Sequence, residues 1–247
     1  MTLERRIPSI RSLSVMWSEG ITDTEARAAV TTVRDFVKGI HDVCAMYGLI
    51  LGPTQIRPFG TWIIQAIPRG DPYWGTQWYV ESATDRQRGQ IIAPRFLELV
   101  RREPWQQAMP HFDLAIMEAD LWDEPERALG TASDPFVLSA CLPGIAAVIS
   151  VHRLRGIPDL RNRISALRRL IVHNLGHVLE VPAVDRENAV DSVGGERHCA
   201  NHCVMRHTTG IDHLIALADQ ERSGPSFCEA CRRDLVRSAI LQRLSNN

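Results

Sequence analysis

His173-Asn174-Leu175-Gly176-His177 places two histidines four residues apart, at the end of a segment with helical periodicity. Apolar residues recur at three- and four-residue steps through 160–179, which predicts an α-helix. Because a helical turn takes about 3.6 residues, both imidazoles project from the same face of this helix. Neutral imidazole nitrogens are common zinc ligands, so this face is predicted to bind a metal ion.

Two close pairs of cysteines follow the helix, and the second pair is a Cys-x-x-Cys motif. Such pairs favour a structural zinc ion held by four thiolates. The four residues are Cys199, Cys203, Cys228 and Cys231. His202 offers an alternative nitrogen ligand within the first pair. A secreted disulfide framework is the competing interpretation, but its cysteines would be spread more evenly along the chain.

The order of these residues resembles the archaemetzincins, zinc metalloproteases of the metzincin clan. Their signature runs His-Glu-x-x-His-x-x-Gly-x-x-His-Cys, then a second Cys, a Met two residues on, and Cys-x-x-Cys. The matching residues are His173, His177, His198, Cys199, Cys203, Met205, Cys228 and Cys231. The resemblance covers about Arg86 to Leu235, and its motifs are sharp only after His173.

The resemblance implies an α/β (α+β) metzincin-like domain with a twisted mixed sheet, an active-site helix and a small zinc-stapled C-terminal part. We expect a single domain, 1–247, with an N-terminal subdomain, 1–180, and a C-terminal zinc-binding subdomain, 181–247. Two zinc ions are implied. The first would be held by His173, His177 and His198, and the second by Cys199, Cys203, Cys228 and Cys231. Met205 would form the Met-turn beneath the first zinc.

Departures from the signature bear on activity. Asn174 stands where the family has its glutamate general base, and an amide is not basic at neutral pH. Glu180 stands where the family has glycine, and extra residues within 181–197 separate the helix from His198. The spacing between the first two cysteines is also one residue shorter than in the family.

Other carboxylates could compensate for the missing base. Glu180 lies one turn beyond His177, so it is a candidate substitute base or third ligand if the helix continues. The segment 181–197 is expected to be a polar loop. It adds three further candidates: Asp185, Glu187 and Asp191. His207 and His213 match no family position and are expected to be surface or helix-packing residues.

Periodicity and turn residues predict the remaining elements. Helices are expected at 25–47, 94–102, 211–220 and 232–244, the first of them capped by Thr22 or Thr24. Strands are expected at 13–17 (an edge strand), 61–67, 112–117, 134–141 and 146–151. The last two are expected to form an antiparallel hairpin. In metzincin-like folds the edge strand pairs with extended substrate, so this hairpin is a candidate peptide-binding edge.

The composition excludes several classes of protein. Apolar residues make up 45% and charged residues 23% of 247 residues, as in an ordinary globular protein. A net charge of −1 argues against nucleic acid or an anionic membrane as partner. The chain has no run of roughly 18–20 apolar residues and no secretory h-region near its start, so we expect a cytoplasmic protein.

The sequence therefore predicts an archaemetzincin-like zinc-dependent metallopeptidase homologue. Its peptide-bond hydrolysis is expected to be impaired, because Asn174 replaces the general base. The alternative is a non-catalytic, zinc-stabilised module that binds a peptide or protein in the same cleft. In both cases the expected partner is a peptide or protein, not nucleic acid or a membrane.

Overall fold

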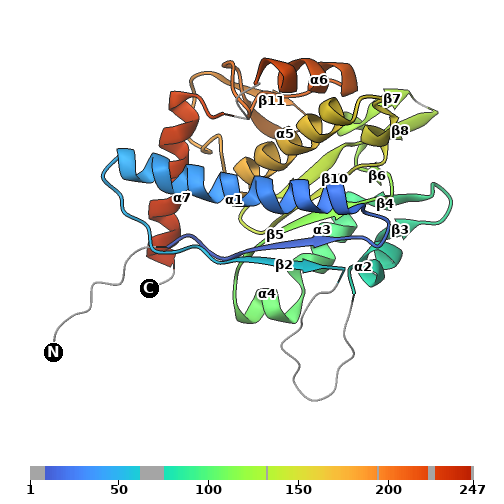
Figure 1. The fold of residues 1–247 in the computed structure, drawn as a ribbon, viewed down its shortest axis with the longest axis horizontal. Coiled ribbons are helices and arrows are strands. Elements are labelled where there is room, and N and C mark those ends of the chain that lie inside the picture. The colour runs from blue at the N-terminus through green and yellow to red at the C-terminus, as the bar shows by residue number, and fades with distance from the viewer. Residues whose placement is uncertain (1–8, 62–74, 132, 194, 222–225, 246–247) are drawn as a thin grey trace.

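A five-stranded sheet forms the centre of the molecule (Figure 1). The computed structural model describes residues 9–61, 75–131, 133–193, 195–221 and 226–245. The sheet strands are β1 (Leu13–Trp17), β2 (Ile56–Gly60), β5 (Phe112–Met117), β9 (Ser139–Leu142) and β10 (Ala146–Ser150). They lie in the order β2–β1–β5–β10–β9, and all neighbours are parallel except β9, which runs antiparallel to β10. The predicted α/β class with a twisted mixed sheet is confirmed.

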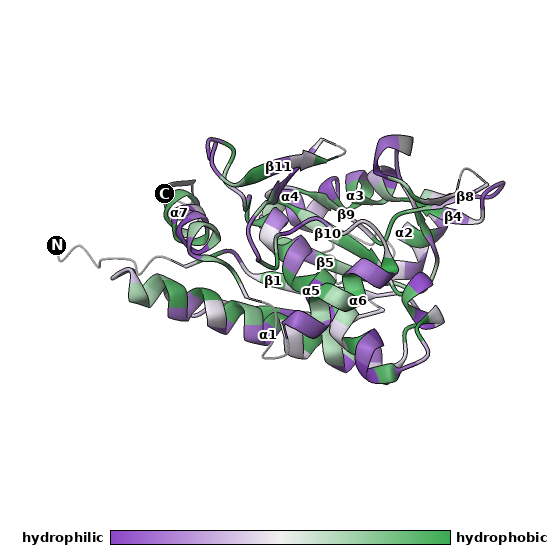
Figure 2. Cartoon of the chain, turned by 90° about the horizontal axis from the view of Figure 1, so that it is seen from above, coloured by the Kyte–Doolittle hydropathy of each residue, from purple (hydrophilic) through white to green (hydrophobic). Residues whose placement is uncertain are grey.

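Helices cover both faces of this sheet. Helices α1 (Asp23–Met46) and α5 (Leu160–Val178) pack on one face, and α2 (Thr76–Ala83) and α3 (Ala93–Arg101) pack on the other. Side chains of β5 alternate between the two cores, so that Leu114 faces the first and Ala115 the second. A strand buried on both faces has an uninterrupted apolar sequence, as 112–117 nearly does. Figure 2 shows hydrophobic residues gathered on the central strands and on the inner sides of the helices.

Short elements complete the chain. Helix α4 (Pro104–Ala108) lies at one end of the sheet, and α6 (Ile211–Gln220) and α7 (Glu229–Ser245) follow the histidine helix. The small strands are β3 (Thr84–Asp85), β4 (Gln90–Ile92), β6 (Leu121–Trp122), β7 (Leu129–Thr131), β8 (Asp134–Phe136), β11 (Val190–Val193) and β12 (Glu196–Cys199). Two 3₁₀ turns are η1 (Pro125–Arg127) and η2 (Arg153–Gly156). Within the described residues no helix has the length and apolar character needed to cross a bilayer.

The edge strand β9 leaves alternate backbone groups outside the sheet. The Ser150 N–H donates to the Leu138 carbonyl (2.9 Å), and in an antiparallel ladder this pairing recurs at every second residue. Ala140 therefore bonds to β10, whereas the N–H and C=O groups of Ser139 and Cys141 point away from it. The predicted antiparallel hairpin at the sheet edge is confirmed.

Three expectations need correction, and a fourth falls largely outside the described residues. Strand β1 is not an edge strand, because β2, which the sequence did not reveal, pairs outside it. The segment 181–197 is not a structureless loop, because β11 and β12 form a hairpin within it. The predicted strand 134–141 divides into β8, which pairs with β7, and β9. The predicted strand 61–67 lies outside the described residues except for its first residue.

An arginine clamp fixes the start of α1. Thr22 caps the helix, and its hydroxyl and the Glu25 carboxylate form a capping box. The buried Glu25 carboxylate also accepts two hydrogen bonds from Arg155 of η2, at 3.0 and 2.8 Å. Burial would raise the pKa of Glu25, but the hydrogen bonds from Arg155 and Thr22 outweigh this effect and lower the pKa below its usual value.

Replacing Arg155 should destabilise the fold. Arg155→Met leaves the Glu25 carboxylate buried without its partner, and we expect the free energy of unfolding to fall by about 2 kcal/mol in urea titrations at pH 7. Because the folded-state pKa of Glu25 is lowered, this contribution is present above the usual glutamate pKa and is lost as pH falls. The Glu25→Gln/Arg155→Met double variant should recover part of the loss. Equal stability of Arg155→Met and the parent would contradict the clamp.

Candidate metal centre

Three histidines converge at the end of α5. His173 and His177 lie on its last turns, and His198 lies on β12. One donor atom from each lies within 4.8 Å of the others. The Nε2 atoms of His173 and His177 are 3.1 Å apart. Two donors bound at 2.0–2.1 Å to one tetrahedral zinc would be about 3.3 Å apart, so this pair is spaced to share one ion.

The histidines are buried and neutral, which is the state that binds metal. The carbonyl oxygen of Val204 lies 2.8 Å from His173 Nδ1, which fixes the tautomer that leaves Nε2 free to bind an ion. Burial lowers the pKa of His177 to about 3 and of His198 to about 4, and neighbouring histidines lower both further. Burial also places the pKa of His173 well below its usual value. At neutral pH all three imidazoles therefore keep a lone pair for a cation. The residues present fit zinc.

The Asn174 side chain is hydrogen-bonded to the sheet edge and to its own helix. Its side-chain NH₂ donates to the Ser139 hydroxyl (2.9 Å) and to the Leu170 carbonyl (2.8 Å). The residue is buried, and it does not line the pocket beside the histidines, whereas Ser139 does. The amide thus joins α5 to the sheet edge and supplies no base.

Glu180 does not reach the histidines, contrary to the expectation that it could be a substitute base or third ligand. Helix α5 ends at Val178, and Glu180 is exposed with φ +58°. The Val181 N–H bonds to the Gly176 carbonyl, and the Glu180 N–H bonds to the His177 carbonyl. These two bonds form a Schellman motif with Glu180 in its left-handed position. The chain therefore turns at the position where the family signature has glycine, although the residue there is Glu180.

The other suggested carboxylates also lie outside the histidine group. Asp185 pairs with Arg237, and Glu187 is exposed. Asp191 is opposite His198 in the hairpin register, and its side chain is exposed. Within the described residues none of them belongs to the group of possible metal ligands around the histidines. His202 is exposed and is not part of the cysteine group.

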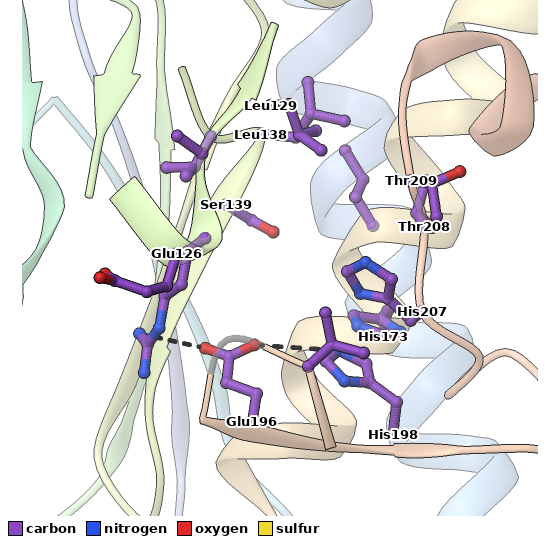
Figure 3. A pocket seen from close by; sticks show the side chains of 15 residues that line it. Glu126, Leu129, Leu138, Ser139, His173, Glu196, His198, His207, Thr208 and Thr209 are labelled. Atoms are coloured by element: carbon purple, nitrogen blue, oxygen red, sulfur yellow. Dashed lines mark ion pairs between the residues drawn. The ribbon is translucent and has the colours of Figure 1, made fainter. Parts of the chain in front are cut away.

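A pocket of about 290 Å³ opens beside the histidines, between β9 and η1 on one side and α5 and β12 on the other (Figure 3). Its lining residues are Glu126, Arg127, Ala128, Leu129, Val137, Leu138, Ser139, Leu170, His173, Val193, Glu196, His198, His207, Thr208 and Thr209. The candidate peptide-binding edge thus forms one wall of the pocket that holds the candidate metal ligands.

Glu196 and His207 were missed as pocket residues. Glu196 Oε2 lies 3.9 Å from His198 Nε2, and its Oε1 lies 3.4 Å from Arg127 Nη1. Burial raises the pKa of Glu196, and Arg127 opposes the rise. The His207 ring lies 4.7 Å from that of His198, so the expectation of an ordinary surface residue is wrong for His207. A signal for Glu196 was available, because residues two apart in a strand face the same side and Gly194-Gly195 is typical of a hairpin turn.

Met205 lies directly beneath the histidine helix. A Cβ atom at Gly176 would be 2.3 Å from Met205 Sδ, so only glycine permits this approach without a shift of the methionine. Met205 is fully buried, and the carbonyl of its neighbour Val204 is the one that orients His173. The methionine thus packs against the helix that carries His173 and His177, and its role as a Met-turn beneath a zinc ion stays a prediction.

The four C-terminal cysteines form a second group. Their sulfur atoms lie within 4.8 Å of one another, and those of Cys199 and Cys228 are 3.6 Å apart. Sulfurs bound at about 2.3 Å to a tetrahedral zinc would be about 3.8 Å apart, and a disulfide would hold them far closer. Thiol hydrogen bonds lower the pKa of Cys199 and raise that of Cys203 to about 12. The group therefore resists holding several thiolates unless a cation is bound.

Two buried, neutral histidines on α5 and a third on β12 lie beside the antiparallel edge strand of a mixed sheet, and a buried methionine packs on the same helix. Solved structures of an archaemetzincin and of a zinc-dependent peptidase share this fold. The archaemetzincin of Methanopyrus kandleri is 21% identical, with 93% of this chain and 95% of that one covered at a TM-score of 0.51. A zinc-dependent peptidase from Methanocorpusculum labreanum is 19% identical, with 91% and 100% covered at a TM-score of 0.53. At these identities the likeness shows the fold.

Two curated archaemetzincins are also similar in sequence to this chain. The archaemetzincin of Nanoarchaeum equitans is 22% identical over 126 residues, which is 51% of this chain and 53% of the relative. That of Archaeoglobus fulgidus is 32% identical over 90 residues, 36% of this chain and 42% of the relative. The chain thus spans about half the length of the curated relatives it matches. No protein-family model matches it. Together the relatives support an archaemetzincin-family identity, as the signature predicted.

Replacing Glu180, which has a positive φ, with glycine should stabilise the protein. A non-glycine residue at positive φ costs roughly 1–2 kcal/mol, part of which is offset because glycine is more flexible in the unfolded chain. We therefore expect Glu180→Gly to raise the free energy of unfolding by about 0.5–1 kcal/mol in urea titrations. Glu187→Gly, at another exposed position of the same segment, is the control and should not stabilise. A loss of stability in Glu180→Gly would contradict the motif.

Proposed function

We propose that this chain is an archaemetzincin-like zinc-dependent metallopeptidase homologue in which peptide-bond hydrolysis is impaired. The single observation that carries the proposal is the combination at the end of α5. Three buried neutral histidines lie beside a sheet-edge pocket, and the residue next to His173 is an amide hydrogen-bonded to Ser139. Peptide or protein is the proposed ligand, as the name of the zinc-dependent peptidase relative suggests.

His173, His177 and His198 would hold a zinc ion, and a bound zinc supplies Lewis acidity that lowers the pKa of water toward about 7. The protein must then provide a base within hydrogen-bond reach. Asn174 has no basic atom, and its NH₂ group is used by Ser139 and Leu170. Loss of a general base typically costs about 10²–10⁴-fold in rate.

The edge of β9 would bind the peptide. The outward N–H and C=O groups of Ser139 and Cys141 can accept one more strand, so an extended peptide would bond to them by strand addition. Pocket residues along this edge, among them Leu129 and Leu138, offer apolar contacts to side chains. Binding in this way needs no hydrolysis, so the same surface serves the alternative of a non-catalytic binding module.

The cysteines would hold a second, structural zinc. A closed site of four thiolates contributes folding energy and leaves no position for substrate. Its ligands come from β12, the loop before Met205 and the start of α7, so one ion would tie the segment 181–247 into a zinc-binding subdomain.

Metal content tests the two-site proposal. We expect two zinc ions per purified chain and one in His173→Ala/His177→Ala. Elemental mass spectrometry measures the zinc content, and circular dichroism checks that each variant is folded. Glu180→Ala, which removes a carboxylate outside the histidine group, should retain two. One zinc in both the parent and the histidine variant would show that the histidines do not hold an ion.

We expect the chain to bind a peptide at the sheet edge without hydrolysing it at an ordinary rate. We expect a fluorescein-labelled apolar octapeptide to bind the zinc-loaded chain. Cys141→Pro should lower the affinity for this peptide at least ten-fold, because proline removes an outward N–H without breaking the ladder to β10. The matched control, Cys141→Val, should bind as the parent does. Unchanged binding in Cys141→Pro would rule out the edge as the docking surface.

Hydrolysis of the same peptide should have kcat/KM below about 10² M⁻¹s⁻¹, against about 10⁴ at the lower end for ordinary enzymes. The His173→Ala/His177→Ala variant gives the background rate. A zinc-dependent rate in the ordinary range would contradict the proposed impairment.

A further inference from the structure

The histidine site contains a carboxylate that the signature of the family does not include. Glu196 comes from the hairpin β11–β12, and it faces the pocket together with His198 because the two are separated by one residue in the same strand. Figure 3 shows the Glu196 side chain beside His198, and its other carboxylate oxygen pairs with Arg127. We propose that Glu196 is a fourth protein ligand of the ion held by His173, His177 and His198, which closes the site. This inference rests on the metal site of the proposed function.

The first argument is distance. Glu196 Oε2 is 3.9 Å from His198 Nε2, and two ligands of one tetrahedral zinc are about 3.3 Å apart. The His173–His177 pair already has such a spacing, at 3.1 Å. Glu196 Oε2 is thus close to His198, but it lies outside the group of donor atoms that are within 4.8 Å of one another, so the carboxylate would have to move toward His173 and His177 to bind the same ion.

The second argument is orientation. The other carboxylate oxygen, Oε1, lies 3.4 Å from Arg127 Nη1, and Arg127 is itself held by the buried Asp123 at 3.2 Å. Metal-binding carboxylates are commonly oriented by such a second contact. Arg127 thus binds one oxygen of Glu196 and leaves the other directed toward His198.

The third argument is charge. Three neutral imidazoles leave the two positive charges of a zinc ion uncompensated in a buried site, and Asn174 provides no anion there. Two glutamates, Glu126 and Glu196, line the pocket. Figure 3 shows the Glu126 side chain pointing away from the histidines, so Glu196 is the one placed to compensate the ion.

The consequence concerns function. Zinc sites with three protein ligands keep a position for water or substrate, whereas sites with four are structural. Asn174 then explains only part of the impairment, because the position at which water would bind is also occupied. The histidine ion would hold the hairpin against α5 and would shape the peptide pocket without acting on the peptide.

The test reads the coordination of the ion. The full-length chain is loaded with Co²⁺ at the histidine site while zinc stays on the cysteines, and its visible spectrum is recorded with and without acetohydroxamate, a chelator that needs open positions. We expect no spectral change in the parent or in the matched control, Glu126→Gln. Glu196→Gln and Glu196→Ala should bind acetohydroxamate, and their affinity for the metal in chelator competition should fall by more than 100-fold.

Two outcomes would overturn the inference. If the parent binds acetohydroxamate as readily as Glu196→Ala does, the fourth position is open and Glu196 is at most a hydrogen-bond partner of His198. Unchanged metal affinity in both Glu196 variants would also show that Glu196 does not bind the ion. If Co²⁺ does not bind the histidines of the parent at all, the metal site of the proposed function fails instead.

A second readout uses hydrolysis. Asn174→Glu alone should raise peptide cleavage less than ten-fold, and Asn174→Glu/Glu196→Ala should raise it at least ten-fold further, because only the double variant has both a base and an open position. Full activity in Asn174→Glu alone would also overturn the inference.

Discussion

The contact between Met205 and Gly176 brings the segment that follows β12 against α5. No side chain other than hydrogen fits at position 176 without moving the methionine, whose side chain therefore packs directly on α5. From there the Val204 carbonyl reaches His173, and the Cys199 N–H bonds to the Met205 carbonyl at 2.9 Å. His198 and Cys199 are neighbours on β12, so their side chains point to opposite faces of the strand. The histidine and cysteine groups therefore lie on opposite faces of β12, close to this packing contact.

Much of the fold and of the two ligand groups was predictable from sequence, since it depended on local patterns. Helical periodicity and the capping residue Thr22 defined α1, and the spacing of His173 and His177 defined the face of α5 that bears ligands. The cysteine pairs indicated a common ion because thiolates at such spacing have few other uses in a chain of this composition. The order of the strands in the sheet was less accessible, because pairing between β1 and β2 joins segments far apart and leaves no local signal.

The errors in the site share a cause. Glu180 was considered because helical spacing was extended past the end of the helix, where the Schellman motif turns the chain away. Sequence patterns do not indicate Glu196 and do not place His207 at the pocket, because their positions depend on a hairpin and on a loop that only tertiary packing brings there. Sequence reasoning identified the missing carboxylate at position 174. The carboxylate that does face His198 lies on the added hairpin, for which the family signature has no counterpart.

That hairpin also shows how extra length can be accommodated next to a site without disturbing it. The first and last residues of an antiparallel hairpin lie side by side. Here Val190 is opposite Cys199, and the Ala200 N–H bonds to the Ala189 carbonyl at 3.0 Å. Residues added at its tip lengthen both strands and leave the base of the hairpin in place, so His198 keeps its position near the base. The connection between β11 and β12 is therefore a suitable point for grafting a foreign loop, an affinity tag or a reporter peptide beside the pocket.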